Sequence, residues 1–177
     1  MSEILVFDTG PLSHFASEGW LGVLKAVVGE RAALIPDVVV AEIMVGAQRD
    51  ARLQAVLDAE WIERRELRSN AEIVMFARYA SLLVKGERNR GEAGVLALAS
   101  TVGGIAVVDD RAARKAAETY GVAYCPTLRL LCDGIRQGLL TVSLVGALAD
   151  DLIASEYHLP FGPGGFEAWA KDQGQLG

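Results

Sequence analysis

Five acidic residues could form a reactive centre in this sequence, because each of them ends or interrupts an apolar stretch: Asp8, Glu42, Glu92, Asp109 and Asp110. Carboxylates gathered at one place repel each other, and a bound cation removes that repulsion. Hard oxygen ligands without histidine favour Mg²⁺ or Mn²⁺ over softer metals. These ions suit phosphoryl chemistry, in which they activate water and stabilise the attacking and leaving oxygens.

Asp8 directly follows the apolar run of residues 4–7, and Gly10 and Pro11 then turn the chain into a helix. Such a run predicts a central strand that is covered on both faces, as in a parallel sheet. Catalytic groups of parallel α/β sheets lie just beyond the carboxyl ends of the strands, so Asp8 is well placed for chemistry. The alternative is that Asp8 only caps the following helix, since Asp is a preferred N-cap residue.

Glu42 belongs to a segment, residues 36–46, whose β-branched residues favour a strand. Pro36 and Asp37 are nevertheless a strong helix start, so we predict a helix. Glu42 would project from an apolar face of that helix and would need a partner. A side chain that reaches solvent or pairs with Arg49 is the alternative.

Glu92 falls in the first turn of a predicted helix over residues 90–100, which is rich in small residues and mostly apolar. The helix dipole favours a negative charge there, which predicts a lowered pKa for Glu92 and an ionised side chain. The same position is equally compatible with ordinary stabilisation of a helix N-terminus.

Strands alternate with helices over the first 124 residues. We expect strands at residues 4–7, 32–35, 61–65, 105–108 and 122–124, and helices at 11–28 (unbroken or divided at Gly19), 36–46, 51–59, 70–84, 90–100 and 111–120. This alternation predicts parallel βαβ units with right-handed crossovers. From residue 126 only helices are expected, at 127–137 and 144–156, before a turn-forming stretch at 161–166 and a short polar end. The prediction is therefore an α/β domain over residues 1–125 with a mostly parallel central sheet, and a C-terminal helical extension over residues 126–177 packed on the same domain.

The composition predicts an ordinary globular chain. Its 177 residues are 51% hydrophobic, which is enough for one core of normal size. The sequence has neither a secretory signal pattern nor an apolar run long enough for a membrane span, so we expect a cytoplasmic protein with no membrane partner. Cys125 and Cys132 lack neighbours for a zinc set and are expected to be buried. His14 and His158 are too isolated for a catalytic triad.

The formal net charge of −6 opposes non-specific attraction to nucleic acid, because Lys and Arg supply most of that affinity. Neutralising the five acids with metal would remove most of this charge, so the composition remains compatible with a phosphodiester substrate. Arg111, Arg114 and Lys115 follow Asp110 on a predicted helix. They would either hold RNA phosphates or form a solvated helix face.

The acidic motifs, taken in order, resemble those of PIN-domain proteins. Asp8 stands in Val-Phe-Asp-Thr-Gly-Pro-Leu, Glu42 comes shortly after Pro-Asp-Val-Val, Glu92 stands in Gly-Glu-Ala, and Asp109 and Asp110 stand in Val-Val-Asp-Asp-Arg. The resemblance extends over residues 3–124 and implies a PIN-like three-layer α/β/α fold. The helical segment after Pro126 resembles a PIN-like subfamily with a C-terminal extension.

This resemblance implies a role for each acid. Asp8 would be the central metal ligand, and Glu42 and Glu92 would complete the site. Asp110 best matches the fourth acid of the family, whereas Asp109 stands where that residue varies.

Two positions depart from the family pattern. Many members have Asp at the position of Glu92, and toxins often have Thr or Ser at the position of Val108. Both departures concern activity more than fold.

Most bacterial members are VapC-like toxins, which are metal-dependent ribonucleases, usually dimeric, that a cognate antitoxin holds inactive. The resemblance therefore implies an endoribonuclease that uses Mg²⁺ or Mn²⁺, acts on RNA, forms a homodimer and is the toxin of a type II toxin–antitoxin pair. The alternative is a non-catalytic PIN-like module that binds a protein. A phosphatase of the haloacid dehalogenase type is not indicated, because the Asp8 motif lacks a second Asp two residues on, and no nucleotide-binding glycine motif is present.

Overall fold

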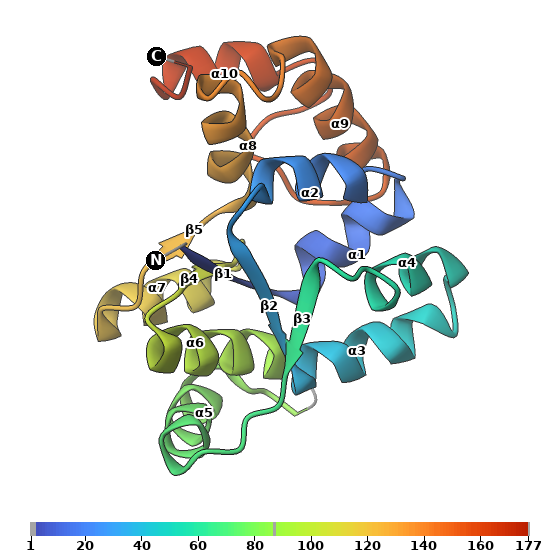
Figure 1. Ribbon diagram of the computed structural model, residues 1–177. Coiled ribbons are helices and arrows are strands. Elements are labelled where there is room, and N and C mark those ends of the chain that lie inside the picture. The colour runs from blue at the N-terminus through green and yellow to red at the C-terminus, as the bar shows by residue number, and fades with distance from the viewer. Residues whose placement is uncertain (1–2, 87, 177) are drawn as a thin grey trace.

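A five-stranded sheet forms the centre of the computed structural model, which describes residues 3–86 and 88–176 (Figure 1). The strands are β1 (Ile4–Phe7), β2 (Ala32–Pro36), β3 (Ile62–Arg65), β4 (Ile105–Val107) and β5 (Tyr124–Cys125). Their order across the sheet is β3-β2-β1-β4-β5, and every neighbouring pair is parallel. The predicted α/β class with a parallel central sheet is confirmed, although β5 begins two residues later than the strand expected at 122–124.

β1 occupies the middle of the sheet because its residues require burial on both faces. Leu5, Val6 and Phe7 are each at most 1% exposed. A continuous apolar run of this kind is stable only where helices cover both sides of the strand. β3 lies at the sheet edge instead, and there Glu63 and Arg64 are exposed to solvent.

Helices cover both faces of the sheet and give three layers (Figure 1). They are α1 (Thr9–Ser17), α2 (Leu21–Val28), α3 (Asp37–Ala47), the 3₁₀ segment η1 (Ala51–Leu53), α4 (Gln54–Leu57), α5 (Asn70–Leu83), α6 (Arg90–Val102) and α7 (Arg111–Tyr120). Figure 1 shows α5, α6 and α7 on one side of the sheet, with α1 and α2 on the other. The helix predicted for residues 36–46 is confirmed as α3, and α1 and α2 are separated at Gly19, whose φ is +76°.

Three more helices follow β5: α8 (Thr127–Arg136), α9 (Val142–Ala154) and α10 (Phe166–Asp172). The helix α10 corrects the sequence prediction, which placed only a turn and a polar end after residue 161. Its Phe166 and Ala170 are at most 1% exposed, and the rings of Phe161 and Trp169 lie 5.3 Å apart. A helix of about two turns offers too few residues for its apolar periodicity to be recognised.

The C-terminal helices contact the α/β layers in more than one place: α8 packs against α2, and the Trp20 indole donates a hydrogen bond of 2.8 Å to Asp151 of α9. Gly134 of α8 allows the approach of α8 to α2, because a Cβ atom at that position would lie 3.0 Å from Cγ2 of Val27. Whether residues 126–177 form a separate extension stays a prediction.

Cys125 and Cys132 are buried free thiols, and burial raises the pKa of each to about 11. In the described part of the chain, no helix is both long and apolar enough to span a membrane.

Candidate active site

The carboxyl ends of β1 and β4 lie side by side, and this places the acids that follow them at one edge of the sheet. Phe7 pairs with Val107 in the parallel register, and the Asp8 amide donates a hydrogen bond of 3.2 Å to the Val107 carbonyl. Asp8 and the pair Asp109 and Asp110 therefore leave the sheet at neighbouring points, as the sequence predicted for the ends of parallel strands.

Asp8 is a buried carboxylate, with 7% of its surface exposed. It precedes α1 at the N-cap position, but its side chain accepts no capping hydrogen bond, so the alternative of a simple helix cap does not describe it. Its buried Oδ1 atom has no hydrogen-bond partner within the described residues. Burial, followed by repulsion from Glu92, Glu42 and Asp109, raises the pKa of Asp8 well above the ordinary value of an aspartate.

Glu42 faces Asp8 from α3 and is held by the backbone of a third element. Its Oε1 accepts a hydrogen bond of 3.0 Å from the Gly91 amide, and its Oε2 accepts one from the Thr9 hydroxyl. Glu42 is half-buried, and within the described residues its hydrogen-bond donors are Thr9 and Gly91, not Arg49. Sequence reasoning did not identify Thr9 and Gly91 as partners, because both contacts join residues more than 30 positions apart.

Gly91 lets the first turn of α6 approach both acids. A Cβ atom at this position would lie 2.6 Å from Oε2 of Glu42 and 3.1 Å from Oδ1 of Asp8. Real Cβ atoms do not come so close to an oxygen without displacing it. The glycine before Glu92 in the sequence was therefore the one available signal that a backbone passes close to another group here.

Glu92 is half-buried in the first turn of α6. Desolvation, followed by repulsion from Glu42 and Asp110, raises its pKa. The prediction of a lowered pKa is therefore wrong, because the loss of hydration and the neighbouring carboxylates outweigh the favourable helix terminus.

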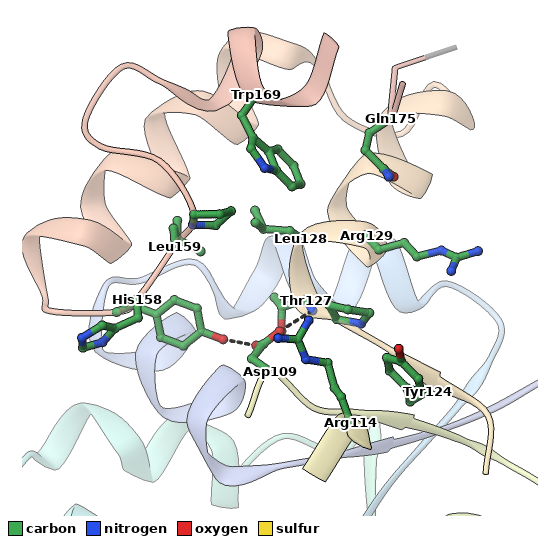
Figure 2. Close-up of a pocket in the computed structure, with 13 residues that line it drawn as sticks. Asp109, Arg114, Tyr124, Thr127, Leu128, Arg129, His158, Leu159, Trp169 and Gln175 are labelled. Atoms are coloured by element: carbon green, nitrogen blue, oxygen red, sulfur yellow. Dashed lines mark hydrogen bonds between the residues drawn. The ribbon is translucent and has the colours of Figure 1, made fainter. Parts of the chain in front are cut away.

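Asp110 and Asp109 make hydrogen bonds with the protein itself. Asp110 is exposed and caps α7, where its Oδ1 accepts a bond of 2.9 Å from the Ala113 amide. Asp109 turns toward the C-terminal helices (Figure 2). Its Oδ1 accepts a bond of 2.8 Å from the Thr127 amide, and its Oδ2 accepts one of 2.6 Å from the Thr127 hydroxyl and another from the Tyr157 hydroxyl. Nothing in the sequence pattern identified Thr127 or Tyr157 as partners.

The three basic residues predicted to hold RNA phosphates follow these acids on α7. Arg111 and Lys115 are exposed, whereas Arg114 is half-buried. Their proposed contact with a substrate stays a prediction.

The residue types at this edge fit a divalent cation. Asp8 presents a buried oxygen that lacks a donor, and it feels the repulsion of Glu42 and Glu92, which a cation would relieve. Within residues 3–86 and 88–176, however, no three acidic, histidine or cysteine side chains are arranged so as to hold an ion as they stand. Asp8, Glu92 and Glu42 would therefore have to draw closer to form a complete site, and Asp109 and Asp110 would have to leave their present donors to join it.

The raised pKa of Asp8 predicts a pH dependence of stability in the metal-free protein. A group whose folded pKa is raised stabilises the fold fully below its unfolded value of about 4, and this contribution is lost as pH rises through the folded pKa. Asp8→Asn removes that loss, so its melting temperature should exceed that of the wild type at about pH 8, and the difference should shrink at about pH 5. Thermal melts in EDTA measure both differences. Asp58→Asn is the matched control, because it neutralises one carboxylate at an exposed position after α4. A difference between Asp8→Asn and the wild type that is the same at both pH values would contradict this prediction.

The hydrogen bond between Tyr157 and Asp109 predicts that removing the Tyr157 hydroxyl group destabilises the fold. Desolvation, followed by the charge of Asp109, raises the pKa of Tyr157 well above its ordinary value, so the phenol stays a donor at neutral pH. Tyr157→Phe should lower the free energy of unfolding by about 1 to 3 kcal/mol, as measured by urea denaturation. Tyr124→Phe is the comparison, because its hydroxyl also donates to a carboxylate, that of the exposed Glu118, and its loss should cost less than about 1 kcal/mol. Equal losses in the two variants would show that Asp109 is as accessible to water as Glu118.

A parallel α/β sheet between two layers of helices, with the buried Asp8 and further acids at the carboxyl ends of its central strands, defines a class of proteins that place their chemistry at that edge. The family model DUF3368, described as a PIN domain, matches residues 4–161, and the chain belongs to this PIN-domain family. No curated protein matches the sequence. The fold is similar to a chain in the crystal structure of VapBC2 from Rickettsia felis bound to a DNA fragment from their promoter, with a TM-score of 0.52 and 12% sequence identity, over 70% of this chain and 98% of that chain.

Proposed function

We propose that this protein is a metal-dependent endoribonuclease that hydrolyses phosphodiester bonds of RNA. The observation that carries the proposal is the buried Oδ1 of Asp8, which lacks a partner within the described residues and lies near other carboxylates at the carboxyl end of the central strands. Asp8 and Glu92 would hold Mg²⁺ or Mn²⁺, with Glu42 kept in place by Thr9 and Gly91. When bound, such an ion activates water and stabilises the attacking and leaving oxygens of a phosphodiester.

We further propose that the protein is the toxin of a type II toxin–antitoxin pair in the cytoplasm. The similar crystal structure contains VapBC2 with DNA from their promoter, and this supports an antitoxin as partner. Large apolar side chains on the surface support a protein partner and a homodimer: Met44 and Val45 of α3 are 55% and 54% exposed, and Ile73 and Val74 of α5 are 51% and 59% exposed.

The test is a titration of Mn²⁺ into the full-length protein with a mixed pool of single-stranded RNA. We expect cleavage that requires the ion and stops when EDTA is added. Cleavage that persists in EDTA would contradict a metal-dependent mechanism. The same titration with Mg²⁺ in place of Mn²⁺ shows which of the two ions supports cleavage.

One observation favours a second function, that of a non-catalytic PIN-like module for protein binding. Asp109 and Asp110 are both engaged by protein donors, and the acids of the described chain do not form a ready site for an ion. A metal that binds only the folded state stabilises it by about 2.7 kcal/mol at a hundredfold excess over its Kd. A melting temperature that Mn²⁺ leaves unchanged, together with intact RNA, would favour the module over the enzyme.

A further inference from the structure

A cavity of about 400 Å³ lies beside the acidic edge, between the α/β layers and the C-terminal helices. Figure 2 shows its walls: Arg114 of α7 and Tyr124 of β5 on the sheet side, Leu128 of α8 and Leu159 further along, and Trp169 of α10 opposite. Cavities of this volume are typical of small-molecule sites. Asp109 lines the same cavity, so the cavity adjoins the edge where Asp8 is buried.

Two arginines, Arg114 and Arg129, line the cavity together with one acid, Asp109. The Nε atom of Arg114 is buried and has no hydrogen-bond partner within the described chain. Arg129 is exposed on α8 and also lines the cavity, and the positive charges of both arginines act on the Tyr124 hydroxyl. A second acid, Glu118, is bonded to Tyr124 at the exposed rim.

The carboxylate of Asp109 already has hydrogen-bond donors of its own. It accepts three hydrogen bonds, two from Thr127 and one from Tyr157. These bonds satisfy its lone pairs. Among the described residues that line this cavity, the buried polar atom that lacks a partner is Nε of Arg114, and it belongs to a cation.

The opposite side of the cavity is apolar and aromatic. Trp169 is half-buried and extends toward the cavity, and Leu128 and Leu159 lie between it and Asp109 (Figure 2). An indole ring and flat apolar walls suit a planar ring, because every nucleobase has a π-face that can stack on an aromatic side chain. A ligand that satisfies both sides combines a planar ring with an anion.

We propose that this cavity binds one nucleotide, with its base against Trp169 and its phosphate beside Arg114 and Arg129. The proposal rests on the proposed nuclease function in taking RNA as the source of the nucleotide, since RNA is the substrate of that function. A free nucleoside monophosphate presents the same chemistry and is the other source.

Binding is measured in EDTA, where no metal-dependent cleavage occurs. A fluorescein-labelled single-stranded RNA of about eight nucleotides is titrated with full-length protein and followed by anisotropy. Arg129→Ala should weaken the affinity about tenfold, because an arginine contact with phosphate is lost. Arg49→Ala removes the same charge from another exposed arginine, which does not line the cavity, and should change the affinity by less than about twofold.

The two sources are separated by competition with unlabelled nucleoside monophosphates. Displacement of the RNA in the wild type but not in Arg129→Ala supports the cavity as the shared site. If a nucleoside monophosphate binds and RNA does not displace it, the free nucleotide is the ligand of the cavity. Equal affinities of the two arginine variants for RNA and for monophosphate would overturn the proposal.

This measurement also separates the cavity from the nuclease function. If RNA binding depends on Arg129 but the protein does not cleave RNA with Mn²⁺, the proposed nuclease function is contradicted and the proposed nucleotide site in the cavity is supported. If the protein cleaves RNA with Mn²⁺ but Arg129→Ala does not change its affinity for RNA, the nucleotide site in the cavity is contradicted and the nuclease function is not.

Discussion

Asp8→Asn is expected to reduce Mn²⁺-dependent cleavage of RNA by about a hundredfold or more, since it would remove the charge of the proposed central metal ligand. Asparagine preserves the shape of the side chain, so the surrounding packing should remain. The oxygen in question is buried, has no other partner, and lies near Glu42 and Glu92, whose charges a cation would balance. Initial cleavage rates at saturating Mn²⁺ measure the loss.

The matched control for this experiment is Asp58→Asn, which also neutralises one carboxylate but at an exposed position after α4. It should cleave RNA at the rate of the wild type. Because Asp8→Asn is also expected to stabilise the metal-free fold, a lost activity with a raised melting temperature identifies a functional residue and not a misfolded protein. Wild-type rates in Asp8→Asn would rule out the proposed role of this carboxylate.

Removal of residues 126–177 is expected to leave an insoluble or unfolded protein. The deletion takes away α8, which packs on α2, and with it the neighbour of Val27, which is only 2% exposed in the intact chain. Buried side chains of this size contribute about 1.5 to 3 kcal/mol each, and a whole domain is stable by only about 5 to 15 kcal/mol. Soluble yield and the cooperativity of urea unfolding measure the outcome. A soluble fragment of residues 1–125 that unfolds cooperatively would show that the extension is dispensable.

A milder change tests the same interface in the full-length chain. Gly134→Val introduces a side chain where a Cβ atom already meets Val27 at 3.0 Å and Leu140 at 3.1 Å. Gly146→Val makes the same change in α9, where a Cβ atom meets nothing within 4 Å. The intrinsic helix propensities are equal in the two cases, so the difference in unfolding free energy reports the packing of α8 at Gly134 against Val27 of α2 and against Leu140. Overpacking of this kind typically costs about 1 to 3 kcal/mol.

The parts of the fold that depend on local pattern could be predicted from the sequence. The apolar run before Asp8 is short, continuous and followed by turn residues, which is sufficient to place a central strand and the acid at its end. The helix that carries Glu42 was predictable because Pro36 and Asp37 are strong start signals despite the β-branched residues that follow. Local signals of this kind do not depend on the rest of the chain.

The parts that could not be predicted depend on contacts between distant residues. Thr9 bonds Glu42 across 33 positions, and Tyr157 bonds Asp109 across 48, and no periodicity in the sequence encodes such a pairing. The pKa of Glu92 was predicted with the wrong direction for the same reason, because desolvation and the neighbouring Glu42 follow from tertiary packing, whereas the helix dipole follows from local structure alone.

Asp109 lies at the acidic edge of the sheet and also accepts the hydrogen bond that holds Tyr157. Any cation that recruits this carboxylate must compete with the tyrosine hydroxyl, and any molecule that strengthens the attachment must weaken the cation's hold on it. Thermodynamic linkage requires the two effects to be equal in free energy. If a cation recruits Asp109, this hydrogen bond would couple the binding of the cation to the attachment of Tyr157, while the packing of α8 on α2 would remain.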